Sequence, residues 1–319
     1  MTESDFEFLR KLLRERSGLV LAADKQYLVE SRLLPVARRT GCSDVGELVQ
    51  ALRRSKPGQL ATLIVEAMTT NESFFFRDKL PFEQLRDTII PKLMAARAAR
   101  RRIRIWCAAA STGQEPYSIA MSLKEMNLRL DGWRVEIIAS DLSNEVLARA
   151  KSGLYSHFEV QRGLPIGLLL KYFTQQGEHW QIAAEIRSMV QFRQLNLLSD
   201  FAHLGVFDLV FCRNVLIYFD RETKAGVLER LSRIVDAEGY LVLGAAETVV
   251  GLTGAFRPLV NERGLYAPAT HRGPCAAYSG VAHRRCRRLT PFLLRPAAPR
   301  SAAQDEQLTQ LQWSDQSIF

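Results

Sequence analysis

Polar side chains follow three β-rich stretches of this sequence, each at the point where the stretch ends. They are Glu115 after residues 102–107, Asp141 after residues 133–140, and Asn214 after residues 207–212. Strands that alternate with helices form a parallel sheet, and ligands of such sheets bind beyond the carboxyl ends of the strands. An acidic residue after the second strand is typical of a group that accepts hydrogen bonds from ribose hydroxyls. Taken together, the three positions predict a site for a nucleoside.

The segment 108–120, AAASTGQEPYSIA, combines small residues with the start of a helix. Small residues let the backbone approach a ligand closely, and a helix N-terminus offers free N–H groups. The segment is neither Gly-x-Gly-x-x-Gly nor a P-loop, which argues against a dinucleotide or a nucleoside triphosphate. Glu115 has two interpretations: it forms a capping box with Thr112, or its carboxylate pairs with a ligand ammonium group. Asp141, Asn214 and Tyr218 likewise have plain structural interpretations as a cap, a turn former and a core residue.

The elements that must position these residues predict an α/β fold with a doubly wound, mostly parallel sheet. Residues 1–75 show apolar spacings of three and four and predict an N-terminal helical domain, with Pro35 interrupting its second helix. Over residues 76–270, β-rich stretches alternate with helical ones, and we expect an edge strand at Gly264-Leu-Tyr. These strands include residues 239–246, which follow a helix expected over 221–235.

Residues 162–195 do not follow this alternation. Trp180-Gln-Ile and Met189-Val-Gln-Phe read as short strands separated by polar turns, so we expect a small antiparallel β-subdomain inserted here. Residues 271–319 contain RRCRR, several prolines and a Ser/Gln-rich end, and they predict a disordered basic tail.

The composition narrows the class of protein further. The 319 residues are 47% hydrophobic and 24% charged, with no apolar run long enough to span a bilayer. The first residues lack the basic and apolar regions of a signal peptide, so we expect a cytoplasmic protein without membrane insertion. The five cysteines and five histidines are isolated, so no metal site is expected. The net charge of +9 favours an anionic partner without specifying which.

Five motifs then occur in order along the chain. They are MTTNESFFFR (68–77), AAASTGQEPYSIA (108–120), ASD (139–141), LNLL (195–198) and FCRNVLIYFD (211–220). In this combination the sequence closely resembles the CheR family, the chemotaxis receptor glutamate methyltransferases of bacteria, over about residues 1–268. The resemblance implies the fold of S-adenosylmethionine-dependent methyltransferases. It also implies an enzyme that forms glutamate methyl esters on the cytoplasmic helices of chemoreceptors in chemosensory adaptation, with S-adenosylhomocysteine as the product.

The resemblance also implies a particular site. The cofactor-binding residues would be Asn71, Ser73, Arg77, Glu115, Asp141, Asn196, Leu197, Asn214 and Val215. Ser73 stands where the family often has Thr, and the hydroxyl is retained. Glu115 would meet the methionine end of the cofactor and Asp141 the ribose. For the chemistry of the transfer we add two hypotheses of our own: Arg77 positions the substrate carboxylate and Tyr218 shapes the pocket, as the two catalytic residues.

Methyl transfer from a sulfonium to a carboxylate is an in-line displacement. Because the ordinary pKa of glutamate is about 4.3, the nucleophile is already ionised near neutral pH. The reaction therefore requires no general base, which agrees with a sequence that shows no Ser-His-Asp or metal-binding pattern. The protein must instead align oxygen, carbon and sulfur, and positioning can supply up to roughly 7–11 kcal/mol.

The basic residues of the N-terminal helices suggest how an acidic receptor helix is recognised. We expect docking at Arg32, Arg38, Arg39, Arg53 and Arg54, mainly through faster encounter, with recruitment to receptor arrays. The stretch 173–180 looks shorter than the loop with which some family members grip a receptor-tethered pentapeptide, so we expect no tether requirement. Two alternatives stay open. One is a non-catalytic S-adenosylmethionine-binding receptor adaptor. The other is a nucleic-acid methyltransferase, which the charge favours and the lack of an Asn/Asp-Pro-Pro-Tyr motif disfavours.

Overall fold

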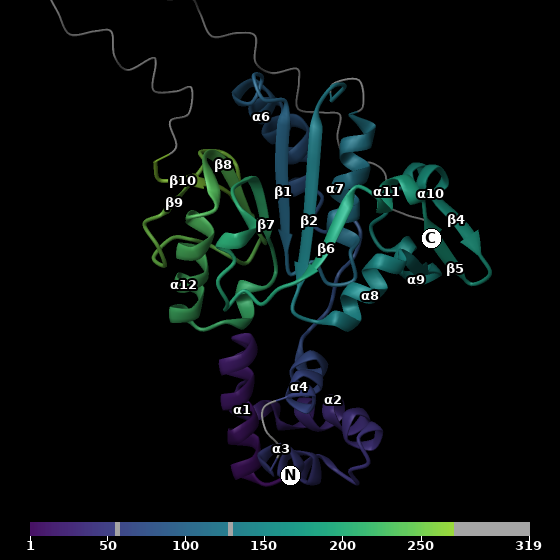
Figure 1. The fold of residues 1–319 in the computed structure, drawn as a ribbon, viewed down its shortest axis with the longest axis vertical. Coiled ribbons are helices and arrows are strands. Elements are labelled where there is room, and N and C mark those ends of the chain that lie inside the picture. The colour runs from purple at the N-terminus through teal and green to yellow at the C-terminus, as the bar shows by residue number, and fades with distance from the viewer. Residues whose placement is uncertain (55–57, 127–129, 271–319) are drawn as a thin grey trace, which may run out of the picture. The chain divides into compact units, whose positions relative to one another are not determined.

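A computed structural model describes residues 1–54, 58–126 and 130–270 of the chain (Figure 1). The tail expected over 271–319 lies outside the described residues. Within the described part, no helix is both long enough and apolar enough to cross a membrane.

The N-terminal residues form four helices with a core of their own. The helices are α1 (Glu3–Ser17), α2 (Gln26–Arg39), α3 (Val45–Arg54) and α4 (Gln59–Met68). Thr2 caps α1 through a capping box with Asp5, and Gly18 ends it in the left-handed conformation, with φ +77°. Leu9, Leu33 and Leu48 are fully buried in the core that the helices share.

The expectation that Pro35 interrupts the second helix is wrong, because Pro35 lies inside α2. A proline in a helix removes one backbone hydrogen bond, to the carbonyl four residues earlier. Pro35 and Ser31 are both exposed, so water can solvate the carbonyl group that loses its partner. The apolar face of α2, with Val29, Leu33 and Val36 buried, keeps the helix continuous through the proline.

The rest of the chain forms a seven-stranded sheet in the order β6-β2-β1-β7-β8-β10-β9. Its strands are β1 (Arg102–Ala108), β2 (Arg134–Asp141), β6 (Val190–Gln194), β7 (Phe207–Cys212), β8 (Val235–Leu243), β9 (Phe256–Pro258) and β10 (Leu265–Pro268). The pairs from β6 through β8 are parallel, and β10 is antiparallel to both of its neighbours. The predicted doubly wound, mostly parallel sheet is confirmed.

Helices cover both faces of this sheet, each over its own apolar core. One core includes residues of α6 (Ile90–Ala96) and α7 (Gln114–Glu125), and the other includes residues of α12 (Arg221–Ser232). The short helix α5 (Leu80–Gln84) leads through a π-helical stretch, Leu85–Ile89, into α6. The chain runs from β1 outward to β2 and β6, then returns to β7 on the other side of β1. This reversal creates a switch point between β1 and β7, where ligands of such sheets bind.

A second, three-stranded antiparallel sheet is inserted between β2 and β6, as predicted, but its boundaries differ from residues 162–195. It contains β3 (Leu154–Ser156), β4 (Phe173–Gln176) and β5 (His179–Ile182), accompanied by α9 (His157–Gln161) and α10 (Ile166–Tyr172) (Figure 1). The stretch from Met189 was expected in this sheet, yet β6 pairs in parallel with β2. A short apolar run does not reveal its partner strand, because the partner is set by tertiary packing. The insert is flanked by α8 (Asn144–Ser152) and α11 (Ala184–Arg187).

The expected edge strand near Gly264 is also placed differently. Residues Leu265–Pro268 do form a strand, β10, but it lies inside the sheet between β8 and β9. The edge is β9, which is only three residues long. A three-residue run carries too little alternation to be recognised in the sequence.

A buried ion-pair network lies at the end of the sheet opposite the switch point. The Arg97 side chain is 3% exposed and donates to Asp208 at 2.6 Å, Asp236 at 2.5 Å and Glu238 at 2.6 Å. Asp208 also accepts from the backbone N–H of Arg104 on β1, at 2.8 Å. Burial alone would raise the pKa of Asp236, but the backbone N–H of Glu238 and the guanidinium groups of Arg97 and Arg100 hold it below its ordinary value.

Replacing Arg97 by Met is therefore expected to lower the free energy of unfolding near neutral pH by about 3 kcal/mol, because it removes the buried positive charge that pairs with three carboxylates. Asp236 has a lowered pKa in the folded state, so its contribution is present above its unfolded pKa and is lost as pH falls through the folded value. The difference between variant and parent should thus shrink in acid. Urea unfolding at several pH values measures this, with the exposed Arg134→Met as control. A constant difference down to the lowest pH would contradict it.

Candidate functional site

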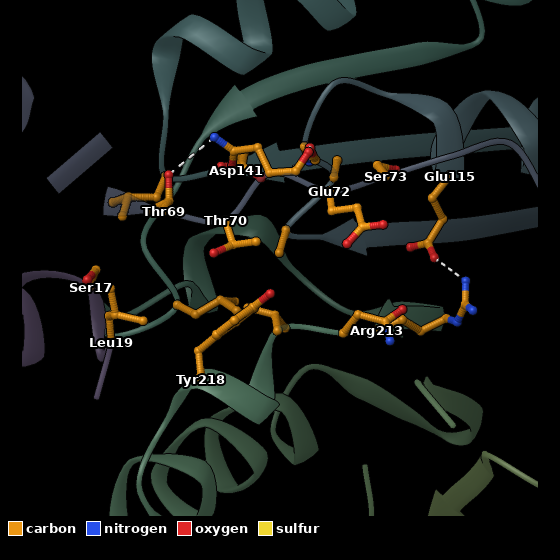
Figure 2. Close-up of a pocket in the computed structure, with 18 of the residues that line it drawn as sticks. Ser17, Leu19, Thr69, Thr70, Glu72, Ser73, Glu115, Asp141, Arg213 and Tyr218 are labelled. Carbon is orange, nitrogen blue, oxygen red and sulfur yellow. Dashed lines mark hydrogen bonds and ion pairs between the residues drawn. The ribbon is translucent and has the colours of Figure 1, made fainter. Parts of the chain in front are cut away.

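A cavity at the switch point brings the predicted residues together (Figure 2). It holds about 990 Å³ of space, counting the part open to solvent. Ten predicted residues line it: Asn71, Ser73, Arg77, Glu115, Asp141, Asn196, Leu197, Asn214, Val215 and Tyr218. Figure 2 shows Ser17 and Leu19 at one end of the cavity and Glu115 with Arg213 at the other. The lining residues that follow strands meet because β1, β2, β6 and β7 are parallel neighbours whose carboxyl ends share one edge. Asn71, Ser73 and Arg77 come from the segment after α4.

Asp141, the last residue of β2, organises one side of this cavity. Its carboxylate accepts from the backbone N–H groups of Ser111 at 2.8 Å and Ser143 at 3.1 Å. Burial raises the pKa of Asp141, against the effect of these two N–H groups. The Ser111 hydroxyl donates to the backbone carbonyl of Asn71 at 3.0 Å, which ties the loop after β1 to the loop after α4. A carboxylate has more acceptor sites than two N–H donors use, so Asp141 can still accept from a ligand hydroxyl.

Glu115 does not form the capping box that its spacing from Thr112 suggests. The N-cap of α7 is Gly113, at φ +94°, and the Thr112 hydroxyl donates to the Gln114 side chain at 2.8 Å. A Cβ at Gly113 would lie 2.9 Å from that of Ala150, so the helix begins where only glycine fits. The Glu115 carboxylate is thereby left to face the cavity.

Arg213 is the partner of Glu115, and the sequence did not single it out. Its Nη1 donates to the Glu115 carboxylate at 2.6 Å, and its Nη2 donates to Asp78 at 2.7 Å and to the Arg77 carbonyl at 2.9 Å. Burial raises the pKa of Glu115, and the charge and hydrogen bond of Arg213 oppose that effect. The interpretation of Glu115 as a ligand for a cation therefore has a structural basis that the capping box lacks.

Glu247 is a second residue that was missed, and it holds the loop after β7. Its carboxylate accepts from four backbone N–H groups: those of Asn214 at 2.8 Å, Val215 at 3.0 Å, Leu216 at 2.7 Å and Gly244 at 2.7 Å. Asn214 has φ +58°, a conformation that non-glycine residues adopt rarely. The four bonds compensate for this strain and fix the loop that lines the cavity.

The segment after α4 forms another wall, and the β-insert supports it. Arg162 donates to Glu72 at 2.6 Å, which lowers the Glu72 pKa, and its guanidinium lies 4.3 Å from the Phe74 ring centroid. A Cβ at Gly163 would lie 2.1 Å from the Phe75 carbonyl oxygen, so glycine is needed for this approach. Arg77 contacts this wall through a hydrogen bond to the Glu72 carbonyl at 3.1 Å, and its guanidinium lies 5.5 Å from the Phe74 ring centroid; its side chain is half-buried.

The end of α1 completes the cavity. This contribution of the helical region was not predicted from the sequence. Ser17 and Leu19 are lining residues. The Asn196 amide donates to the Arg16 carbonyl at 2.6 Å, and the Val20 N–H donates to the Tyr218 carbonyl at 2.9 Å. The helical segment is thus hydrogen-bonded to the two loops that follow β6 and β7.

The five arginines expected to dock a partner divide into two groups. Arg32 donates to the Met68 carbonyl at 2.7 Å and to the Thr70 hydroxyl at 3.1 Å, next to the cavity. Arg53 donates to the Ser4 carbonyl at 2.8 Å and pairs with Asp5 at 3.4 Å. These two guanidinium groups are therefore engaged within the helical region. Arg38, Arg39 and Arg54 are exposed on its surface, and Arg53 is exposed as well despite its two contacts.

The donors and acceptors of this cavity fit S-adenosylmethionine. A buried carboxylate after β2 suits ribose hydroxyls, and a second buried carboxylate after β1 suits the ammonium of the methionine part. The loop after β6 places the amide of Asn196 and the apolar side chain of Leu197 in the cavity wall, and groups of this kind suit an adenine. The fold and the cavity define the class of S-adenosylmethionine-dependent methyltransferases.

Comparisons with known proteins identify the family within this class. The sequence model for "CheR methyltransferase, SAM binding domain" matches residues 71–264, and that for "CheR methyltransferase, all-alpha domain" matches residues 4–69. The chain is 45% identical over 266 residues to Chemotaxis protein methyltransferase 1 of Pseudomonas aeruginosa, covering 82% of this chain and 96% of the relative. It is 43% identical over 265 residues to Chemotaxis protein methyltransferase Cher2 of Pseudomonas putida, with the same two coverages. The chain belongs to the CheR methyltransferase family.

Proposed function

We propose that the chain is a protein-glutamate O-methyltransferase that acts on the cytoplasmic helices of chemoreceptors in chemosensory adaptation. The observation that carries the proposal is the set of side chains that line the cavity. The described lining residues include three carboxylates and two arginines but no histidine or lysine. Glu72 and Glu115 are paired with arginines, and Asp141 accepts two backbone N–H groups. Such a cavity suits an acceptor that arrives already deprotonated, as a carboxylate does.

The chemistry divides between the cofactor and the protein. When bound, S-adenosylmethionine supplies an electrophilic methyl group on a sulfonium. Asp141 would hold the ribose hydroxyls, and Glu115 would hold the ammonium group. The loop fixed by Glu247 would bring Asn214 and Val215 to the reacting end of the cavity. These groups act by positioning, since the acceptor carboxylate needs no proton removed.

Arg77 and Tyr218 are the residues we assign to the incoming glutamate. Both line the cavity and both remain partly exposed, so a side chain from a partner can reach them. The Arg77 guanidinium would orient the acceptor carboxylate through a charge-assisted hydrogen bond. Tyr218 would form the apolar wall that keeps water from the carboxylate, whose nucleophilicity strong hydration lowers.

The proposed partner is an acidic receptor helix, met in the cytoplasm at receptor arrays. Relatives named as chemotaxis methyltransferases and the exposed arginines of the helical region support this choice. We further propose that no tethered pentapeptide is required, because only Gly177 and Glu178 separate β4 from β5. The absence of an Asn/Asp-Pro-Pro-Tyr motif after β7 supports a protein acceptor over a nucleic acid.

The double substitution Arg38→Glu with Arg39→Glu is expected to lower kcat/KM for receptor by about 10-fold at low salt, since it reverses charges that steer an acidic helix. The kcat at saturating receptor should change little, because neither residue lines the cavity. Initial rates at low and high salt measure this. The effect should fade at high salt, where surface charges are screened. An equal loss at both salt concentrations would argue against steering.

The proposed function is tested by transfer of a radiolabelled methyl group to a purified receptor cytoplasmic fragment. Label that is released by mild alkali is expected, since esters hydrolyse where methylated amines do not. Calorimetry with S-adenosylhomocysteine shows separately whether the cofactor binds. Binding without transfer to any of several receptor fragments would support a non-catalytic adaptor. Transfer to nucleic acid would support the other alternative. Either result would overturn the proposal.

A further inference from the structure

The guanidinium of Arg213 joins three segments that meet in the cavity wall. Its side chain is 1% exposed and bonds to Glu115 on α7, to the Asp78 carboxylate and to the Arg77 carbonyl. Figure 2 shows its fork directed at Glu115. The same guanidinium lies 5.9 Å from the ring centroid of Phe82. A buried guanidinium is costly unless its donors are paired; both terminal nitrogens of Arg213 are paired, while its Nε has no hydrogen-bond partner among the described residues.

The charges of this cluster do not cancel. Arg213 carries one positive charge, while Glu115 and Asp78 carry two negative charges when ionised, so the sum is one negative charge. The Asp78 side chain is 40% exposed and can be solvated by water, whereas that of Glu115 is 13% exposed and faces the cavity. The uncompensated negative charge therefore resides at Glu115, where a cationic ligand group would complete the balance.

Other titratable groups around Glu115 change this picture little. Arg77 opposes the effect of burial on the Glu115 pKa, and Glu247 adds to it. The thiols of Cys107 and Cys212 also interact with Glu115, but burial raises the pKa of both well above its ordinary value, so they are neutral. Arg213 remains the one group in hydrogen-bond contact with the Glu115 carboxylate among the described residues.

We infer that Arg213 is a positioning residue for cofactor binding. It holds the charged Glu115 carboxylate at the place where the ammonium of the cofactor's methionine part binds. Through the Arg77 carbonyl and Asp78 it also fixes the segment that carries Arg77. The inference rests on the cofactor role proposed for Glu115. Burial raises the Glu115 pKa and Arg213 lowers it, so removal of Arg213 favours the neutral carboxyl group.

The test compares two ligands that differ at the relevant group. S-adenosylhomocysteine carries the ammonium and carboxylate, while 5′-methylthioadenosine has the same adenosine and sulfur without them. For Arg213→Gln, calorimetry is expected to show about 30-fold weaker binding of S-adenosylhomocysteine and less than about 3-fold weaker binding of 5′-methylthioadenosine. The loss should diminish as pH rises above the ordinary glutamate pKa of about 4.3, because burial keeps the Glu115 pKa raised and Glu115 must lose its proton to bind an ammonium. The parent should vary less over that range.

Two further variants keep the inference falsifiable. Arg213→Lys retains the charge without the fork, and it should restore the weak pH dependence but not the full affinity. Asp78→Asn removes the exposed carboxylate that shares Arg213, so that Arg213 neutralises Glu115 more fully. This variant should weaken the binding of S-adenosylhomocysteine and leave the binding of 5′-methylthioadenosine unchanged. Thermal unfolding of each variant reports whether it folds, and Asp78→Asn carries the test if Arg213→Gln does not.

Equal losses for both ligands with no pH dependence would reduce Arg213 to a purely structural role and overturn the inference. So would unchanged affinity for S-adenosylhomocysteine in Arg213→Gln. Both readouts are binding constants measured without a receptor. If the proposed receptor methylation proved wrong, these constants could still support the role of Arg213, so the two failures can be told apart.

Discussion

Glu247→Ala is expected to lower the free energy of unfolding by about 4 kcal/mol, because four backbone N–H groups would lose the carboxylate that accepts from them. For a chain of this size the corresponding fall in Tm is about 6 °C. Asn214, at φ +58°, would also lose the bond that stabilises its conformation. We therefore expect S-adenosylhomocysteine to bind the variant weakly even at temperatures where it is folded. Differential scanning calorimetry and titration calorimetry measure the two effects.

Glu247→Gln keeps the size of the side chain but removes its charge and replaces one acceptor oxygen by an NH₂ group. It therefore distinguishes the loss of hydrogen bonds from the loss of side-chain volume. Each carboxylate oxygen accepts from two N–H groups, so either orientation of the amide places its NH₂ against two donors. The Gln variant should therefore be clearly destabilised, though less than Ala. Glu30→Ala, at an exposed position of α2, is the matched control and should leave Tm nearly unchanged. A Gln variant as stable as the parent would show that the four hydrogen bonds do not carry the effect.

Asp141→Asn is expected to weaken the binding of S-adenosylhomocysteine by about 100-fold. The substitution removes a charged group that would accept hydrogen bonds from the ligand and that accepts them from the cavity wall. Asp141 would hold ribose hydroxyls, and it fixes the loop after β1 through the N–H of Ser111. The loss should therefore extend to adenosine and 5′-methylthioadenosine, which carry the same ribose. Titration calorimetry with the three ligands gives the comparison.

Glu115→Gln provides the contrasting pattern in the same experiment. Because Glu115 is assigned to the ammonium group, its substitution should weaken the binding of S-adenosylhomocysteine. The binding of the two ligands that lack this group should stay unchanged. Glu145→Gln, at an exposed position of α8, serves as the control for removing a carboxylate nearby. If Asp141→Asn spared adenosine, or if Glu115→Gln weakened all three ligands equally, the assignment of the two carboxylates would be wrong.

The sheet and the site at its edge could be predicted because both depend on local patterns. The apolar runs 102–107, 133–140 and 207–212 became β1, β2 and β7 with boundaries shifted by one residue or less. Parallel strands end at one edge, so the polar residues that follow them must meet there. Glu115, Asp141 and Asn214 do line one cavity.

Arg213 and Glu247 were missed for different reasons. Arg213 lies within a recognised motif, but its function depends on Glu115, 98 residues away, and no local pattern reveals that pairing. Glu247 directly follows the β-rich run 239–246, so the rule that located the other site residues would have indicated it had it been applied to this fourth strand. The strand itself, β8, begins earlier, at Val235.

Local spacing failed where tertiary contacts decide. Thr112 and Glu115 have the spacing of a capping box, but Gly113 takes the N-cap position and Glu115 pairs with Arg213. Arg32 is predicted to dock a partner because it is basic and lies on a helix. The structure adds that its guanidinium caps the carbonyl groups at the end of α4, a contact that the sequence does not reveal. The contributions of Ser17 and Leu19 to the cavity could not be predicted, because they require knowing how the helical segment packs.

The identity of the atom that receives the methyl group tests the central claim most directly. The chain would be incubated with S-adenosylmethionine and a purified receptor cytoplasmic fragment, in the presence of an unrelated helical protein and RNA as competing acceptors. Mass spectrometry of the digested products then locates the added mass of one methyl group. We predict it on glutamate side chains of the receptor fragment, with removal by mild alkali. Methylation of lysine, of RNA or of the unrelated protein, or no transfer by a chain that binds the cofactor, would contradict the account.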